Sequence, residues 1–257
     1  VKEVPDWISY GMIAAGLGIR LIFSFKTFEW YFFLAGILGF LAMFMIGNFM
    51  YYTKQWGGGD TKILSALGAI FATIPAQKFF LINLLINLLI IGALYGLIWS
   101  IFLAIKNNKK FINEIKRKVK DRNKILTIIA TLIIISVLDI IFIENYIIKT
   151  IIIAIILLVA LYYYLLIFIK AMEESSMYKL IPISKLTEGD WIANDIKINN
   201  RIIYKKSSLG VSKKQIEFIK NSKIKKVLIK EGIPFIPSIF ITLIITLIFG
   251  NIIALVF

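Results

Sequence analysis

The sequence contains no cysteine and no histidine among its 257 residues. Without cysteine, the chain has no disulfide, no thiol nucleophile and no thiolate ligand for a metal. Without histidine, the Ser-His-Asp and Cys-His mechanisms and the usual zinc ligands are excluded as well. Any acid–base chemistry therefore falls to carboxylates, lysine or tyrosine, and we expect no metal ion and no cofactor.

Acidic residues are scarce, with 15 Asp and Glu against 30 Lys and Arg, and the formal net charge is +15. The chain is also 59% hydrophobic, and several apolar runs are long enough to cross a bilayer, which takes about 20 helical residues. In a membrane protein, basic connections hold a cytoplasmic orientation beside anionic lipid. We therefore expect membrane lipids, and not nucleic acid, to be the partner of this charge.

The apolar runs predict an all-α polytopic membrane protein with about six to seven membrane helices. Each run is bounded by charged residues or by proline and glycine, which is where helices are expected to begin and end. The predicted helices lie near residues 7–25, 30–52, 61–74, 79–105, 125–143, 147–170 and 235–257.

A polar stretch, residues 171–232, departs from this pattern and predicts a small α+β soluble domain inserted before the last helix. Residues 178–186 and 190–198 alternate like strands. A short helix is expected in "VSKKQIEFIKN", where Ser212 and Gln215 have capping-box spacing, and another strand in "KKVLIKEG". The expected organisation is a membrane helical domain over 1–170, a cytoplasmic domain over 171–232 and a C-terminal membrane helix over 233–257.

Lysine and arginine are distributed unevenly among the connections, which predicts the orientation. The connection 106–124 holds nine basic residues and the polar stretch 170–231 holds fourteen, so both are expected in the cytoplasm. The turns on the other side hold only four, at Arg20, Lys26, Lys78 and Lys149. Alternating crossings then bring the stretch 56–60 to the cytoplasmic face of a multi-pass protein in the cell membrane.

The stretch "WGGGDTKILSALGAI", residues 56–70, places an aspartate after three glycines at the start of an apolar helix. Glycines leave the backbone open to close approach by another chain. Asp60 could cap the helix, where a negative charge is favourable. A carboxylate at membrane depth is also costly and often functional, so capping and chemistry both stay open on local grounds.

This stretch resembles the GxGD-x-K-(L/I)-(L/I)-x-ALGA motif of the prepilin peptidases, a family of intramembrane aspartyl proteases. The family removes the short basic leader from pilin and archaellin precursors. The residues that fall on the motif are Gly57, Gly59, Asp60, Lys62, Ala66, Leu67, Gly68 and Ala69. The resemblance implies that Asp60 is a catalytic acid.

Two further segments are similar to the same family. "KEVPDW", near Val1, resembles the segment that follows the family's first catalytic aspartate, and "GIPFIPSIF", from Gly232, resembles a Pro-Phe-x-Pro signature before the last helix. Laid on this pattern, the first catalytic aspartate is expected about three positions before Val1, outside this sequence. Asp6 is an alternative partner for Asp60.

The implied proteolysis requires two carboxylates, because water would be the nucleophile in a chain that lacks histidine and cysteine. One ionised aspartate takes a proton from water while a protonated one polarises the scissile carbonyl. Mutual repulsion raises the pKa of one member of such a pair. A single aspartate would not be sufficient.

The expected substrate is a preflagellin or prepilin-type precursor with a basic leader. Gly57, Gly58 and Gly59 would let it lie extended beside Asp60, and Glu3 and Asp6 would attract its basic residues. The inserted domain and the absence of cysteine resemble the archaeal preflagellin branch. Two alternatives stay open: a presenilin-like or signal-peptide-peptidase-like protease, which shares GxGD, and a transporter that uses Asp60 for a cation.

Overall fold

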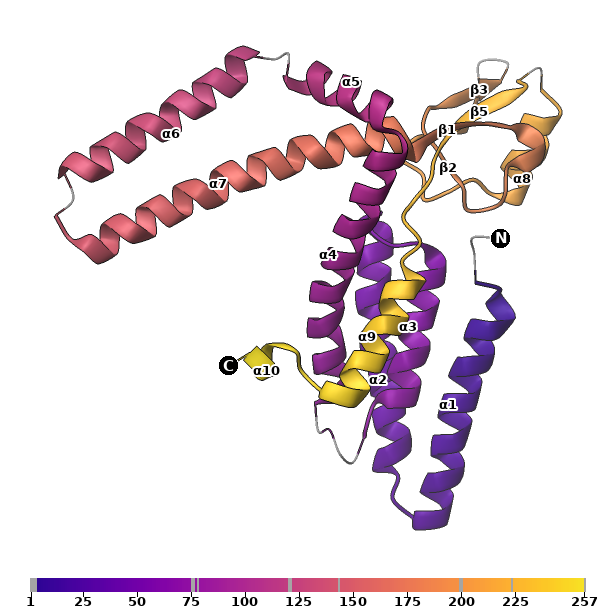
Figure 1. Ribbon diagram of the computed structural model, residues 1–257. Helices are drawn as coiled ribbons and strands as arrows, with labels where there is room; N and C mark the ends of the chain where they lie inside the picture. Colours follow the sequence, from indigo (N-terminus) through magenta and orange to yellow (C-terminus); the bar gives the residue numbers. More distant parts are fainter. Residues whose placement is uncertain are drawn as a thin grey trace. The chain divides into compact units, whose positions relative to one another are not determined.

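The chain is predominantly helical, with a small sheet region, as its computed structural model shows (Figure 1). The structure describes residues 4–74, 77, 79–119, 122–142, 144–198, 201–222 and 224–256. The chain divides into two compact units, Val1–Trp99 with Ile181–Phe257, and Ser100–Leu180. Each unit is considered by itself, and the domain boundaries expected from the sequence stay a prediction.

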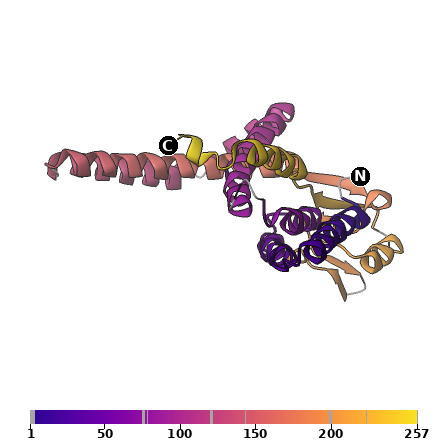
Figure 2. The ribbon, with the colours of Figure 1, turned by 90° about the horizontal axis from the view of Figure 1, so that it is seen from below.

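Four helices make up the N-terminal part of the first unit. They are α1 (Asp6–Thr27), α2 (Tyr31–Tyr52), α3 (Gly58–Phe71) and α4 (Phe80–Lys106), the last of which continues into the second unit. Three of them agree with the expected ranges to within two residues. Helix α3 begins and ends three residues earlier than expected, because the glycines and Asp60 form its first turn. Figure 2 shows α1, α2 and α3 side by side.

Helices α2 and α3 pack backbone against backbone through glycines. A Cβ atom added to Gly68 would lie 2.3 Å from the carbonyl oxygen of Gly39, and one added to Gly39 would lie 2.5 Å from that of Gly68. Nearby, the Thr61 hydroxyl donates a hydrogen bond to the carbonyl oxygen of Gly47 at 2.9 Å. Small residues permit this approach between membrane helices, so part of the motif in α3 serves packing.

Arg20 is buried inside the first unit, with 8% of its surface exposed. It lies in α1, and its guanidinium donates to the carbonyl oxygens of Ala69 at 2.8 Å and Ile70 at 2.9 Å, and to the Thr73 hydroxyl at 2.9 Å. A further bond reaches the Phe32 carbonyl at 3.0 Å. The sequence analysis counted Arg20 with the charges of an outer turn; in the structure it lies within α1 and satisfies carbonyls that the end of α3 would otherwise leave without partners.

The C-terminal apolar run forms a shorter helix than expected. Helix α9 (Ile236–Phe249) ends at Gly250, and a separate turn, α10 (Ile253–Val256), follows. Gly250 has φ 70°, a left-handed conformation that glycine adopts without strain. The predicted continuous helix over 235–257 is therefore interrupted.

A buried amide satisfies the backbone at this interruption. Asn87 of α4 donates to the Thr246 hydroxyl at 2.9 Å and to the Gly250 carbonyl at 2.7 Å. Its own carbonyl oxygen accepts from the Ile252 N–H at 3.0 Å. Asn87 is fully buried, so it binds polar groups that the end of α9 would leave unpaired in an apolar setting.

Among the described residues, four helices have the length and composition to cross a membrane. They are Asp6–Thr27, Tyr31–Tyr52, Phe80–Lys106 and Tyr146–Met177. Helices α3 and α9 have 14 residues each, and a helix of that length spans about 21 Å, less than a hydrocarbon core of about 30 Å. The chain is thus a multi-pass membrane protein by these helices, and the expected count of six to seven spans stays a prediction.

The small sheet region follows the expected order of elements. Its elements are β1 (Tyr178–Pro182), the 3₁₀ turn η2 (Ile183–Lys185), β2 (Trp191–Ile192), β3 (Ile196–Ile198), β4 (Arg201–Tyr204), α8 (Lys213–Lys220) and β5 (Lys226–Lys230). The strands form a three-stranded sheet in the order β1-β5-β2 and a separate β3-β4 pair. Strand β4 was not expected from the sequence. The core of the region includes Tyr204, Val211 and Ile219.

The capping box predicted for α8 is confirmed. The Gln215 N–H donates to the Ser212 hydroxyl at 3.4 Å, and the Ser212 N–H donates to the Gln215 side-chain oxygen at 2.9 Å. Each side chain therefore satisfies the other residue's backbone N–H, as this spacing requires.

The second unit contains α5 (Asn108–Val119), α6 (Arg122–Phe142), α7 (Tyr146–Met172) and a π-helical turn, η1 (Glu173–Met177). The sequence predicted α6 and α7 to within three residues but treated 106–124 as a loop. That prediction is wrong for α5, whose apolar residues recur at helical spacing. Its end is tied to η1 by ion pairs of Arg117 and Lys118 with Glu174.

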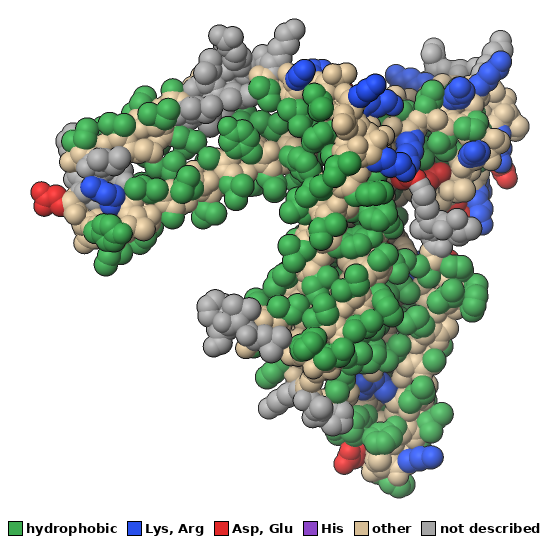
Figure 3. Space-filling model, in the orientation of Figure 1, with side chains coloured by type: hydrophobic (Ala, Val, Ile, Leu, Met, Phe, Trp, Pro, Cys, Tyr) green, Lys and Arg blue, Asp and Glu red, His purple; other side chains and the backbone are tan. Residues whose placement is uncertain are grey.

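Hydrophobic side chains cover most of the helix surface that Figure 3 displays, while lysine and arginine gather over the sheet region. Large apolar side chains point outward along the long helices, for example Trp7, Ile19 and Leu38. An exposed apolar surface of this extent is typical of helices that face lipid.

Candidate active site

Asp60 lies in the first turn of α3, directly ahead of the apolar part of that helix. Its Oδ2 atom accepts a hydrogen bond from the Gly57 backbone N–H at 3.0 Å, and Gly57 is the extended residue that precedes the helix. Asp60 thus makes a capping contact with one carboxylate oxygen. Within the residues that the structure describes, Oδ1 has no hydrogen-bond partner, which leaves that oxygen available for chemistry.

Burial raises the pKa of Asp60 to about 6, and the hydrogen bond from Gly57 opposes the shift without cancelling it. Desolvation disfavours the charged form of a carboxyl group, which is why its pKa rises. A carboxyl with such a pKa exists in appreciable amounts in both protonation states near neutral pH. Asp60 can therefore either hold or accept a proton, as acid–base catalysis requires.

Gly58 and Gly59 are not required by the packing of the described residues, whereas a Cβ atom added to Gly57 would lie 3.3 Å from the Asp60 Oδ2 atom. A Cβ atom added to Gly59 would lie 3.6 Å from the Val4 nitrogen, and one added to Gly58 would lie 3.8 Å from the Tyr51 ring. Both are ordinary van der Waals contacts, unlike the overlap that would occur between α2 and α3. Packing therefore does not explain these two glycines, and the expectation that another chain approaches the backbone there stays a prediction.

The start of α1 lies against the first turn of α3. Val4 flanks Gly59, and the Asp6 carboxylate forms an ion pair with the Lys62 ammonium group. The same ammonium group lies 5.6 Å from the centre of the Tyr10 ring. Asp6 thus contacts Lys62, whereas the recorded partner of Asp60 is a backbone N–H. The alternative roles of Asp6 as catalytic partner or substrate contact stay predictions.

Glu3, the other acid expected to attract a basic leader, lies outside the described residues.

Trp56 is a site residue that the sequence reasoning missed. It directly precedes the glycines, has 8% of its surface exposed, and its ring centre lies 5.3 Å from that of Phe235. The Phe235 ring in turn fills the space beside Gly92, where an added Cβ would lie 2.7 Å away. A tryptophan next to a glycine run was the available signal, and the Phe235 contact could not be read from local sequence.

The rest of the motif forms the buried face of α3. Ala66 and Ala69 are completely buried, and Leu67 has 4% of its surface exposed. Together with Gly68 they let α3 pack closely against its neighbours. These motif residues therefore hold the helix in place, while its first turn carries the reactive group.

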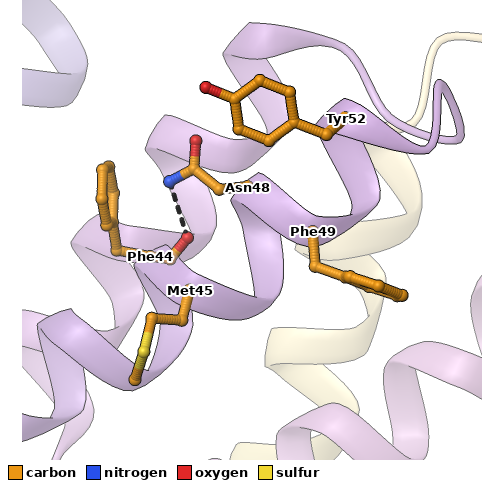
Figure 4. Close-up of a pocket in the computed structure, with 5 residues that line it drawn as sticks. All are labelled: Phe44, Met45, Asn48, Phe49 and Tyr52. Carbon is orange, nitrogen blue, oxygen red and sulfur yellow. Dashed lines mark hydrogen bonds between the residues drawn. The ribbon is translucent and has the colours of Figure 1, made fainter.

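Two other features, a group that could bind a metal ion and a hollow on the protein surface, were considered as alternative sites. Among the described residues, no group of three acidic, cysteine or histidine side chains is placed to hold a metal ion. A shallow hollow lies on the outer face of α2, where the Asn48 amide donates to the Phe44 carbonyl, and Figure 4 shows its lining. It contains none of the candidate site residues.

Comparison with known proteins finds a matching family and two similar proteins. Residues 1–103 match the type IV leader peptidase family. A preflagellin peptidase of Methanocaldococcus jannaschii is 32% identical over 69 residues, which is 27% of this chain and 29% of that protein. One of Methanococcus voltae is 35% identical over 78 residues, 30% of this chain and 32% of that protein. No solved structure matches the chain.

The matched stretches amount to less than a third of either relative's length. The family match over residues 1–103 includes "KEVPDW" and "GGGDTKILSALGAI", the two segments in which the resemblance was found. In the structure these two segments lie against each other at Val4 and Gly59. Residues 1–103 are thus similar to the type IV leader peptidase family.

Proposed function

We propose that this chain is an intramembrane aspartyl endopeptidase that removes the short basic leader from preflagellin or prepilin-type precursors, with Asp60 as one catalytic acid. The proposal rests on one observation: three separate segments of the chain make contact at the turn that carries Asp60. Val4 packs beside Gly59, Asp6 pairs with Lys62, and Phe235 stacks on Trp56. Each of these segments resembles a different part of the peptidase pattern.

Asp60 suits the proposed chemistry because its carboxyl can be either protonated or ionised near neutral pH. In its protonated form it would donate a hydrogen bond to the scissile carbonyl oxygen, and in its ionised form it would accept a proton from water. The resemblance assigns the second carboxylate to a position that precedes Val1. Asp6 is the alternative, and its ion pair with Lys62 would have to open first.

The glycines at 57–59 supply the room that a substrate needs. A peptide bond must come within about 3–3.5 Å of the attacking water and the catalytic acids. The open side of Gly58 and Gly59 would let a precursor chain lie extended next to Asp60. The two named relatives are preflagellin peptidases, which supports a preflagellin-type precursor as the substrate class.

We further propose that cleavage occurs at the cytoplasmic face of the cell membrane. The turn that carries Asp60 and the sheet region lie in one compact unit, and lysine and arginine are concentrated in that region. Positively charged segments remain on the cytoplasmic side of the membrane.

The test is a cleavage assay with the protein, including any residues encoded ahead of Val1, reconstituted in lipid together with a precursor whose leader contains lysine or arginine. Mass spectrometry should find a new N-terminus directly after the leader. Asp60→Asn should abolish the product. Asp190→Asn is the matched control, because Asp190 also accepts a backbone N–H three residues earlier, from Thr187 at 2.8 Å, but lies in the sheet region. Equal cleavage by wild type and Asp60→Asn would reject the proposal.

A further inference from the structure

Helix α5 carries a strip of exposed residues in which lysines and apolar side chains alternate. The strip consists of Lys109, Ile112, Lys116 and Val119, which follow one another at spacings of three and four residues. Such spacings place side chains on the same face of a helix. All four are exposed, and Ile112 and Val119 have 45% and 43% of their surfaces exposed.

The neighbouring strip of the same helix is used for packing. Phe111 makes an edge-to-face contact with Phe168 of α7, with ring centres 5.5 Å apart. Arg117 and Lys118 form ion pairs with Glu174. These contacts fix which face of α5 turns toward α7 and leave the strip of Ile112 and Val119 as the second apolar surface of the helix.

The chain on either side restricts where α5 can lie. Only Asn107 separates it from α4, whose apolar run ends at Lys106. A helix that begins one residue after a membrane-length helix starts at the boundary between hydrocarbon and water. An amphipathic helix at that depth lies in the plane of the interface, with apolar side chains toward the acyl chains and basic ones toward the headgroups.

The positive charge of α5 favours an anionic lipid surface over a zwitterionic one. The helix has five basic residues and one acid, and two of the lysines flank the exposed apolar pair. A lysine near an anionic bilayer surface is attracted to it, whereas a zwitterionic surface contributes little attraction. Lys109 and Lys116 can reach phosphate oxygens while Ile112 and Val119 enter the hydrocarbon boundary.

We propose that the strip Lys109, Ile112, Lys116 and Val119 is a docking surface for anionic phospholipid headgroups, and that α5 is an interfacial helix. This surface is separate from the turn of Asp60 and does not depend on the proposed peptidase activity. It gives the basic segment 106–124 a specific contact in addition to its effect on orientation.

The absence of cysteine in the chain allows a clean test with the intact protein. A single cysteine introduced as Ile112→Cys would carry a polarity-sensitive dye in nanodiscs of phosphatidylglycerol or of phosphatidylcholine. Asn113→Cys is the matched control, because residue 113 follows Ile112 directly but does not belong to the strip. Quenching by lipids that carry a spin label in the acyl chain would report contact with the bilayer.

The expected result is strong quenching of the label at position 112 in phosphatidylglycerol, several-fold weaker quenching in phosphatidylcholine, and weak quenching at position 113 in both. Adding Lys109→Gln and Lys116→Gln should lower the signal in phosphatidylglycerol to the level seen in phosphatidylcholine. Equal quenching at position 112 in the two lipids, or equal quenching at positions 112 and 113, would overturn the proposal.

Discussion

The substitution Asp60→Asn separates the capping contact of this residue from its chemistry. Asparagine keeps the side-chain oxygen that accepts the Gly57 N–H but cannot be ionised or transfer a proton. If capping were the whole role of Asp60, the variant would cleave normally. The proposed mechanism instead requires the loss of essentially all cleavage from a protein that remains folded.

The same variant should be more stable than wild type at neutral pH. The pKa of Asp60 rises from 3.8 to about 6 in the folded protein, so the folded state disfavours the charged form. Below pH 3.8 the carboxyl is protonated in both states and carries no penalty, and the penalty grows until the pH exceeds 6. A shift of this size corresponds to at most about 3 kcal/mol.

Thermal unfolding in detergent at about pH 7.5 and about pH 4, paired with the cleavage assay, measures both effects. Asp60→Asn should raise the unfolding temperature at the higher pH and leave it nearly unchanged at the lower one. Asp190→Asn provides the baseline for losing an aspartate that accepts a turn hydrogen bond. Residual cleavage by Asp60→Asn, or a stabilisation that does not depend on pH, would refute the reasoning.

Three further substitutions test the surroundings of this turn. Gly59→Val should lower cleavage sharply by placing a bulky side chain beside Val4. Full activity of this variant would contradict a role of Gly59 in substrate binding. Gly68→Ala should lower the free energy of unfolding by about 1–3 kcal/mol through overlap with α2. Gly96→Ala should not destabilise, because its added Cβ atom would have no described atom within 4 Å. Asp6→Lys and Lys62→Asp should each lower cleavage, and the double variant should restore it. If Asp6 only attracted a basic leader, the double variant would not restore cleavage.

The sequence predicted best what is determined locally. The long helices α1, α2 and α4 follow from apolar runs that end at charged or turn-forming residues. The capping box of Ser212 and Gln215 follows from a spacing of three residues. In both cases the residues that make the structure lie within a few positions of one another, so no knowledge of distant partners was needed.

The polar contacts inside the helical part could not be predicted in this way. Arg20 was only counted as a charge near an outer turn, because its partners at Ala69 and Ile70 lie about fifty residues away. Asn87 likewise bonds to Thr246, 159 residues along the chain. An isolated polar residue in an apolar run was the available signal, but its partner depends on the fold.

At the candidate site, sequence similarity singled out Asp60 and the glycines before it, but not how the turn is held. Trp56 and Phe235 fall in or beside segments that were recognised, yet their stacking depends on the tertiary structure. The ion pair of Asp6 with Lys62 was likewise not foreseen, because both residues were considered for other roles.

Helices α1 and α3 are joined by polar contacts at two well-separated points. Asp6 and Lys62 join them at one end, and Arg20 binds the carbonyls near the other end of α3. Contacts at two separate points restrict both the sliding and the tilting of α1 against α3. The two contacts share no residue and lie at different ends of α3, so the destabilisation from removing both should be close to the sum of the two separate effects.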